Sequence, residues 1–103
     1  MTKDIFNELN INNEDLKQVC QKHKVKSLFV FGSATNDSFK NGVSDIDFLV
    51  EFENVTFDSY FDFLEELQKL LNYEKIDLVT LDSVKNKIIN DEINSTKEIL
   101  YAA

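Results

Sequence analysis

Residues 31–52 read FGSATNDSFKNGVSDIDFLVEF, and this stretch decides the expected fold. It contains both glycines of the chain, Gly32 and Gly42. From residue 45 to residue 53 apolar and polar side chains alternate, the pattern of a strand with one buried face. The residues just before Gly32, Val25–Phe31, are rich in β-branched and aromatic side chains. They predict another strand, which ends in a tight turn at the glycine.

The flanking segments predict helices and a third strand. Residues 13–24 carry acids in the first turn and apolar residues at helical spacing, so a helix capped by Asn13 is expected. Ser59 and Asp62 resemble a capping box, and an apolar stripe of helical period follows them. Residues 75–81, KIDLVTL, predict the third strand. Further helical pieces are expected at residues 4–9, 83–89 and 91–101.

The order of these elements predicts an α/β (α+β) fold, in which a small mixed three-stranded sheet packs against helices. The helix between the second and third strands gives a connection long enough for a parallel, right-handed pair. Residues 1–103 are expected to form a single domain, because a chain of this length without proline, repeat or linker offers no boundary.

Composition excludes several classes of function. The chain has 11 basic and 19 acidic side chains and no arginine, so its formal charge is 11 − 19 = −8. Proteins that bind nucleic acid neutralise phosphates with clustered Lys and Arg, so direct nucleic-acid binding is not expected. The single cysteine, Cys20, excludes a disulfide framework. Without a long apolar stretch or a signal peptide, the chain is expected to be cytoplasmic and to bind no membrane.

The candidate chemistry begins with two short motifs. Gly32 and Ser33 follow a strand, where a glycine bend can turn backbone N–H groups and a hydroxyl toward a phosphate. Asp45 and Asp47 lie two residues apart on a strand, so their carboxylates share a face and their Cα atoms are about 6.5 Å apart. No cation lies beside them in the sequence, and Mg²⁺ commonly binds such carboxylates together with substrate phosphate. Each motif alone is more often an ordinary turn or a solvated strand edge.

Asp77 makes the combination more specific. It lies near the start of the third strand between Ile76 and Leu78, where a charge without a partner is unfavourable. If the second strand is antiparallel to the first and parallel to the third, the Gly-Ser pair, the Asp-x-Asp pair and Asp77 meet at one edge of the sheet. Phosphate donors and three carboxylates then converge from three separate segments.

The succession of Gly-Ser, a spacer, Asp-x-Asp and a later strand aspartate resembles the nucleotidyltransferase superfamily with the DNA polymerase β-like (palm-like) fold. The small size resembles its minimal nucleotidyltransferase (MNT) branch. The resemblance implies that Gly32 and Ser33 hold the triphosphate of ATP. It also implies that Asp45 and Asp47 bind Mg²⁺, as two ions in all, and that Asp77 is the third metal carboxylate, beside the acceptor hydroxyl.

The similarity runs from about Asp15 to the C-terminus and implies an enzyme that transfers AMP from ATP to a hydroxyl group. Members of this branch act as antitoxins beside a HEPN-domain ribonuclease toxin, and they transfer AMP to a tyrosine of that toxin. A HEPN toxin is therefore the expected partner, in a hetero- or homo-oligomer. A chain of this size has little room for a walled acceptor site of its own, and its negative charge suits a basic partner.

Two alternatives remain open. One keeps the enzyme and changes the acceptor to a small cationic molecule. The other is a non-catalytic antitoxin or binding module with a degenerate site. Tyr60 and Tyr101 are expected to pack against the core rather than to lie in a partner interface.

Overall fold

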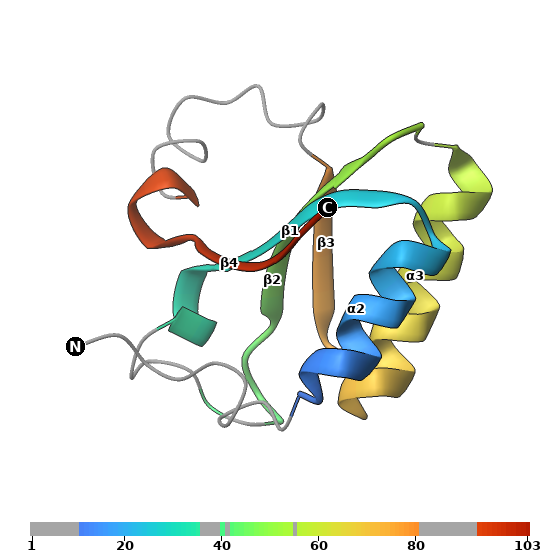
Figure 1. Cartoon of the computed structure of the whole chain (residues 1–103). Helices are drawn as coiled ribbons and strands as arrows, with labels where there is room; N and C mark the ends of the chain where they lie inside the picture. Colours follow the sequence, from blue (N-terminus) through green and yellow to red (C-terminus); the bar gives the residue numbers. More distant parts are fainter. Residues whose placement is uncertain (1–10, 36–39, 41, 55, 81–92) are drawn as a thin grey trace.

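The computed structural model describes residues 11–35, 40, 42–54, 56–80 and 93–103. Their fold is α+β, with a mixed four-stranded sheet and two helices on one of its faces (Figure 1). The expected helical pieces at residues 4–9 and 83–89 lie outside the described residues. In chain order the elements are α2 (Asn13–Lys22), β1 (Val25–Phe31), the 3₁₀ turn η1 (Gly32–Thr35), β2 (Ile46–Phe52), α3 (Phe57–Leu71), β3 (Ile76–Thr80) and β4 (Glu98–Ala102).

The strand order of the sheet is β3-β2-β1-β4. β1 pairs antiparallel with β2 and with β4, while β2 pairs parallel with β3. The predicted parallel pair joined by a helix is therefore confirmed, with α3 as the connection. The expected number of strands is wrong, because β4 adds a fourth strand beside β1.

The end of the chain is the main correction to the predicted secondary structure. Residues 93–96 are helical, but β4 replaces the last part of the helix predicted at residues 91–101. β4 pairs with β1 through an irregular register and buries Leu100 against the core. Pairing with β4 gives hydrogen-bond partners to the backbone N–H and C=O groups on that side of β1. This stabilisation depends on a distant segment, so no local pattern in the sequence indicates it.

In both helices the cap lies earlier in the sequence than predicted, by one residue in α2 and by three residues in α3. The Asn12 side chain accepts hydrogen bonds from two backbone N–H groups in the first turn of α2, at 3.0 and 3.2 Å. Asn12 and not Asn13 is therefore the cap. The capping box of α3 consists of Thr56 and Ser59 instead of Ser59 and Asp62. In both helices a nearby residue with the same hydrogen-bonding chemistry takes the position.

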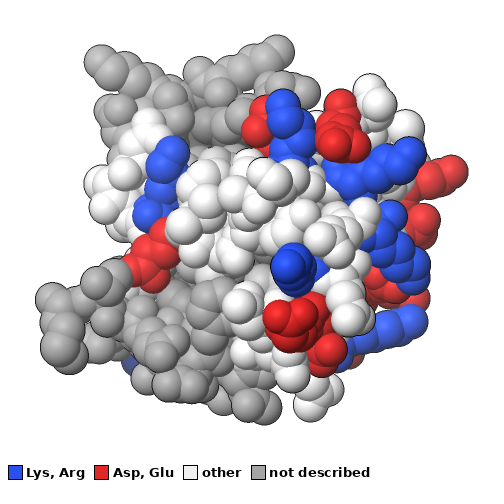
Figure 2. Space-filling view, in the orientation of Figure 1, with Lys and Arg blue, Asp and Glu red and all other residues white. Residues whose placement is uncertain are grey.

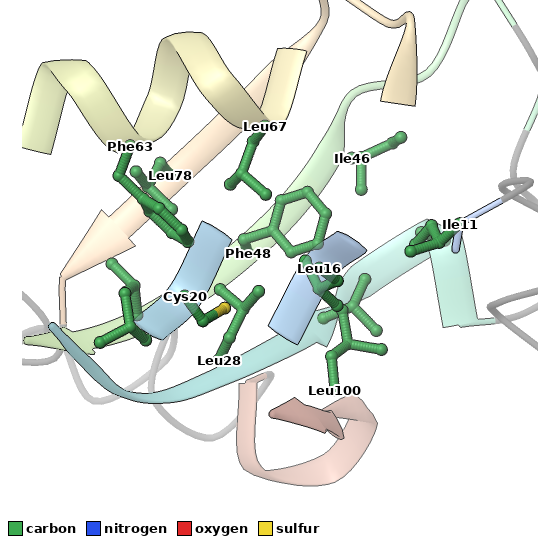
Figure 3. Close-up of a cluster of buried hydrophobic side chains, with 14 of the residues drawn as sticks. Ile11, Leu16, Cys20, Leu28, Ile46, Phe48, Phe63, Leu67, Leu78 and Leu100 are labelled. Carbon is green, nitrogen blue, oxygen red and sulfur yellow. The ribbon is translucent and has the colours of Figure 1, made fainter. Parts of the chain in front are cut away.

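The main core lies between the sheet and the two helices (Figure 3). The alternation of β2 places its even-numbered residues in this core, as predicted, and Phe48 packs there with Phe63 of α3. Tyr60 and Tyr101 are half-buried against the same cluster, as expected. The largest fully buried side chains of the described residues are Phe48, Phe63, Leu16, Leu28, Ile46, Leu67, Ile93, Val30, Val50 and Cys20, and all of them except Ile93 belong to this core.

The opposite face of the sheet carries a smaller apolar cluster, whose buried members are Phe31, Leu49 and Ile93. Alternation along β2 puts Asp47 on the same face as Leu49. Alternation along β3 likewise puts Asp77 on the face of Val79, which packs against this cluster. Both aspartates therefore lie on the face that α2 and α3 leave free.

Glu66 of α3 connects the two helices. Its carboxylate accepts a hydrogen bond from Lys22 Nζ at 2.7 Å and contacts the His23 ring. These hydrogen bonds lower the pKa of Glu66, and the bond from Lys22 has a larger effect than the bond from His23. Figure 2 shows basic and acidic side chains interspersed on the side of the molecule that carries α2 and α3. Among the helices of the described segments, none has the length and apolar character needed to cross a bilayer.

The Cys20 thiol is expected to be unreactive in the folded chain. Its side chain is fully buried, and burial raises its pKa to about 12. Because the thiolate is the reactive form, a thiol reagent at pH 8 should label the native protein hardly at all and the protein in guanidinium rapidly. Mass spectrometry of both samples measures this difference. Equal rates of labelling would mean that α2 does not pack on the sheet as described.

Candidate functional site

β1 ends in a bend that only glycine fits. Gly32 has a φ of +74°, which L-amino acids with a side chain rarely adopt. Asp47 is the Cα partner of Phe31, the residue just before the bend. A Cβ atom built on Gly32 would lie 2.6 Å from Oδ2 of Asp47. The backbone conformation and the neighbouring carboxylate therefore both require glycine, and they place the Gly-Ser bend directly against Asp47.

The parallel pairing of β2 and β3 brings a second carboxylate to this place. Asp77 is the Cα partner of Asp47. Paired residues of parallel strands point to the same face, with neighbouring strands about 4.8 Å apart. Asp47 is half-buried and Asp77 is exposed. Two of the three predicted carboxylates are thus side by side at the edge where the bend lies.

The remaining predicted residues flank this pair. Asp45 is exposed and directly precedes β2, whose first residue, Ile46, donates its N–H to the Lys75 carbonyl at 2.8 Å. That bond joins the starts of β2 and β3, and so keeps Asp45 at the same end of the sheet as Asp77. Ser33 follows the bend within η1 and is half-buried.

These residues suit a hard cation that also takes ligands from a substrate. Carboxylate oxygens are the protein ligands that Mg²⁺ prefers, and Mg²⁺ usually takes only one or two of them. Because Gly32 has no side chain, the Asp47 carboxylate can lie directly against the bend. Across the segments that the structure describes, no three His, Cys, Asp or Glu side chains form a ready metal-binding group. A metal here would therefore need oxygens from the nucleotide, and the three-carboxylate ligand set stays a prediction.

Thr96 is a site residue that the sequence analysis missed. Its Oγ1 accepts a hydrogen bond from the Gly32 N–H at 3.0 Å, while Thr35 Oγ1 donates to the Gly32 carbonyl at 2.7 Å. The bend is therefore held through both of its backbone groups. The Gly32 N–H, expected to face a phosphate, is bonded to Thr96 in this structure. Thr96 lies 64 residues further along the chain, so no local motif could indicate it.

An aromatic patch, consisting of Phe57, Tyr60 and Phe61, lies at the start of α3, and Tyr60 links it to β3. The Tyr60 hydroxyl donates to the Leu78 carbonyl at 2.5 Å, and burial, followed by the charge of Asp77, raises the pKa of Tyr60. The centroid of the Phe61 ring lies 5.1 Å from that of the Tyr60 ring and 4.7 Å from that of the Phe57 ring. Phe57 is 79% exposed and Phe61 48% exposed. Large exposed aromatic groups of this kind are typical of binding surfaces, and the sequence analysis missed them.

α2 and α3 form a groove of about 440 Å³ away from this site. Asp15 and Glu66 line it together with Lys22 and Lys69, so both signs of charge are present. None of the predicted site residues lines it. The groove therefore has neither the carboxylate pair nor the glycine bend that the expected chemistry needs.

Comparison with known proteins identifies the family. Residues 14–103 match the family described as "Polymerase beta, Nucleotidyltransferase". The chain is 32% identical over 98 residues to a protein of Methanocaldococcus jannaschii, and the match covers 84% of the chain and 94% of the relative. A second protein of that organism is 39% identical over 83 residues, with 79% and 80% covered. Both relatives are provisionally named protein adenylyltransferases.

Solved structures share the fold. One is a toxin–antitoxin complex with AMP-PNP, in which the matching chain has a TM-score of 0.70 at 19% identity, over 90% of this chain and 75% of that one. Another is a complex of a tri-AMPylated Shewanella oneidensis HEPN toxin with its MNT antitoxin, with a TM-score of 0.63 at 18% identity, covering 92% and 73%. Together with the match over residues 14–103, the fold and the placement of the carboxylates lead to one conclusion: the chain belongs to the polymerase β-like nucleotidyltransferase family.

Proposed function

We propose that the chain is a Mg²⁺-dependent protein adenylyltransferase that transfers AMP from ATP to a tyrosine hydroxyl of a HEPN ribonuclease toxin, and that it acts as the antitoxin of that toxin. The observation that carries the proposal is the placement of Asp47 against Gly32 and in register with Asp77. The names of the relatives and the HEPN toxin–MNT antitoxin complex with the same fold support this choice of substrate and partner.

In the proposed reaction the nucleotide binds at the Gly-Ser bend. Ser33 offers a hydroxyl to the triphosphate, and the absent side chain of Gly32 lets the phosphates approach Asp47. Asp45 and Asp47 would hold Mg²⁺ together with phosphate oxygens, since hard oxygen ligands suit this ion. When bound, the ion neutralises negative charge on the triphosphate and on the departing pyrophosphate.

The reaction is an in-line displacement. The acceptor oxygen forms a bond to the α-phosphorus of ATP, the bond from that phosphorus to the bridging oxygen breaks, and pyrophosphate leaves. Asp77 accepts the proton of the acceptor hydroxyl; it is exposed, so an acceptor on another protein can approach it. The two strands fix the relative positions of Asp47 and Asp77, and positioning of this kind supplies much of the rate enhancement of such reactions.

The aromatic patch supports a protein as the acceptor. Phe57 and Phe61 offer exposed apolar surface at the start of α3, next to Tyr60, whose hydroxyl bonds to β3 at Leu78, one residue after Asp77. Asp58 lies between them in the sequence and is exposed. A partner surface with apolar and basic side chains would complement this combination. A small cationic acceptor would gain nothing from aromatic side chains that lie on α3, outside the site.

Replacement of both exposed aromatic residues should weaken the binding of the acceptor protein and leave the binding of ATP unaffected. Phe57→Ser combined with Phe61→Ser is expected to raise the KM for the acceptor protein by about tenfold or more, because buried aromatic residues dominate interface energies. The affinity for ATP should stay unchanged. The matched control is Ile99→Ser, which removes a 57% exposed apolar side chain from the opposite edge of the sheet. An unchanged KM for the acceptor in the double variant would refute this docking surface.

The test of the function is label transfer. The chain is mixed with Mg²⁺ and ATP labelled at the α-phosphate, with a HEPN ribonuclease in one sample and a small cationic amine in another, and the products are separated. Label on a tyrosine of the ribonuclease, with loss of its RNase activity, is the expected result. Label on a small cationic molecule would support that alternative instead. A tight complex that forms without label would indicate a non-catalytic binding module.

A further inference from the structure

We propose that Tyr73 is a positioning residue, which fixes the loop before β2, described at residues 40 and 42–45, and thereby sets the place of Asp45. The inference rests on the proposed function, because it assigns Asp45 to Mg²⁺ and nucleotide binding. Tyr73 does not touch the reacting groups. It acts through the loop backbone.

The Tyr73 hydroxyl holds the loop at two points. It donates to the Ser44 carbonyl and accepts the N–H of Gly42 at 3.0 Å. Ser44 directly precedes Asp45, so one of these bonds acts on the peptide group that joins the loop to the aspartate. Gly42 has a φ of +82°, and its N–H therefore takes a direction that a residue with a side chain would rarely give it.

Tyr73 can impose this position because it is itself fixed. Asn72 ends α3 in the left-handed conformation, and the Tyr73 N–H donates to the Gln68 carbonyl at 3.1 Å, the arrangement of a Schellman cap. The Tyr73 ring packs against the main core. The hydroxyl is thus attached to the helix end and the core, and it reaches across 31 residues of sequence to the loop.

Other contacts hold the loop less firmly. The Lys40 N–H donates to Ser44 Oγ at 3.0 Å, a bond within the loop that does not attach it to the rest of the fold. Lys75 Nζ reaches the Val43 carbonyl at 3.4 Å, a long bond from a flexible side chain. The Tyr73 hydroxyl, in contrast, links two backbone groups of this loop to the body of the protein. Loss of such a supporting contact typically costs about 10- to 100-fold in metal affinity or activity.

The test compares Tyr73→Phe with Tyr101→Phe. The two variants remove the same hydroxyl group, and Tyr101 lies on β4 at the other edge of the sheet. Two measurements are made on the full chain: amide hydrogen exchange at Gly42 and Ser44, and the Mg²⁺ concentration needed for half-maximal binding of a nonhydrolysable ATP analogue.

For Tyr73→Phe we expect faster exchange at Gly42 and about a tenfold higher Mg²⁺ requirement, with nucleotide binding restored at saturating Mg²⁺. Tyr101→Phe should match the wild type in both measurements. A purely structural role would speed exchange and leave the Mg²⁺ requirement unchanged, and that result would overturn the inference while the proposed function stands. If the wild-type chain binds no nucleotide at any Mg²⁺ concentration, the proposed function itself fails, and the inference with it.

Discussion

Asp47→Asn is expected to lower the rate of adenylyl transfer about a thousandfold while the protein keeps its fold. The amide has the size of the carboxylate, so the packing between the bend and β3 persists, but the negative charge that we propose holds the cation is lost. Metal coordination of this kind stabilises a transition state by several kcal/mol, and about 4 kcal/mol corresponds to about a thousandfold in rate. Steady-state transfer of labelled AMP measures the loss, and circular dichroism checks the fold.

Asp62→Asn is the matched control for this variant. Asp62 is an exposed aspartate on α3, where it lines a pocket with Lys22 and His23. The same change of charge there should leave transfer within about twofold of the wild type, since an exposed charge far from a site is largely screened. A rate for Asp47→Asn above a tenth of the wild-type rate would show that this carboxylate does not hold the cation.

Gly32→Ala is expected to cost both stability and activity. The alanine would have to adopt a backbone φ of +74°, and its Cβ would lie 2.6 Å from Asp47 Oδ2. The carboxylate or the bend must therefore shift. A side chain in the left-handed conformation costs about 1–2 kcal/mol, and the clash adds to that cost. Because a displacement of about 1 Å can cost a hundredfold in rate, transfer should fall by at least that factor.

Gly42→Ala separates the two causes of this loss. Gly42 has a similar φ of +82°, but nothing lies within 4 Å of a Cβ placed there. Its substitution should therefore cost only the conformational part. The unfolding free energies of both variants, measured by denaturant titration, should differ by about 1 kcal/mol or more, with Gly32→Ala the less stable. Equal free energies would mean that the Asp47 carboxylate does not lie against the bend.

The local patterns in the sequence predicted the central part of the fold well. β1 has the predicted bounds, Val25–Phe31, and β2 and β3 lie within the predicted ranges 45–53 and 75–81. Each of these strands has a pattern that is readable on its own: β-branched residues, strict alternation, and a glycine where the chain must bend. The parallel pairing followed from the helix between β2 and β3, since a connection of that length permits it.

The features that the sequence did not indicate depend on distant partners. The segment that forms β4 has apolar residues at helical spacing, and it becomes a strand because one side of β1 is open to it. Thr96 and Tyr73 contact the bend and the loop from 64 and 31 residues away. A pattern within one segment carries no information on such contacts, although the patterns correctly predicted that Gly32, Asp47 and Asp77 lie together at one end of the sheet.

The most direct test of the account is a crystal structure of the chain with Mg²⁺ and a nonhydrolysable ATP analogue. The proposed function predicts the triphosphate beside Gly32 and Ser33, with Asp45 and Asp47 as ligands of the cation and Asp77 facing the α-phosphate. A nucleotide bound instead in the groove between α2 and α3, or bound at the bend with Asp77 turned away from it, would contradict the account.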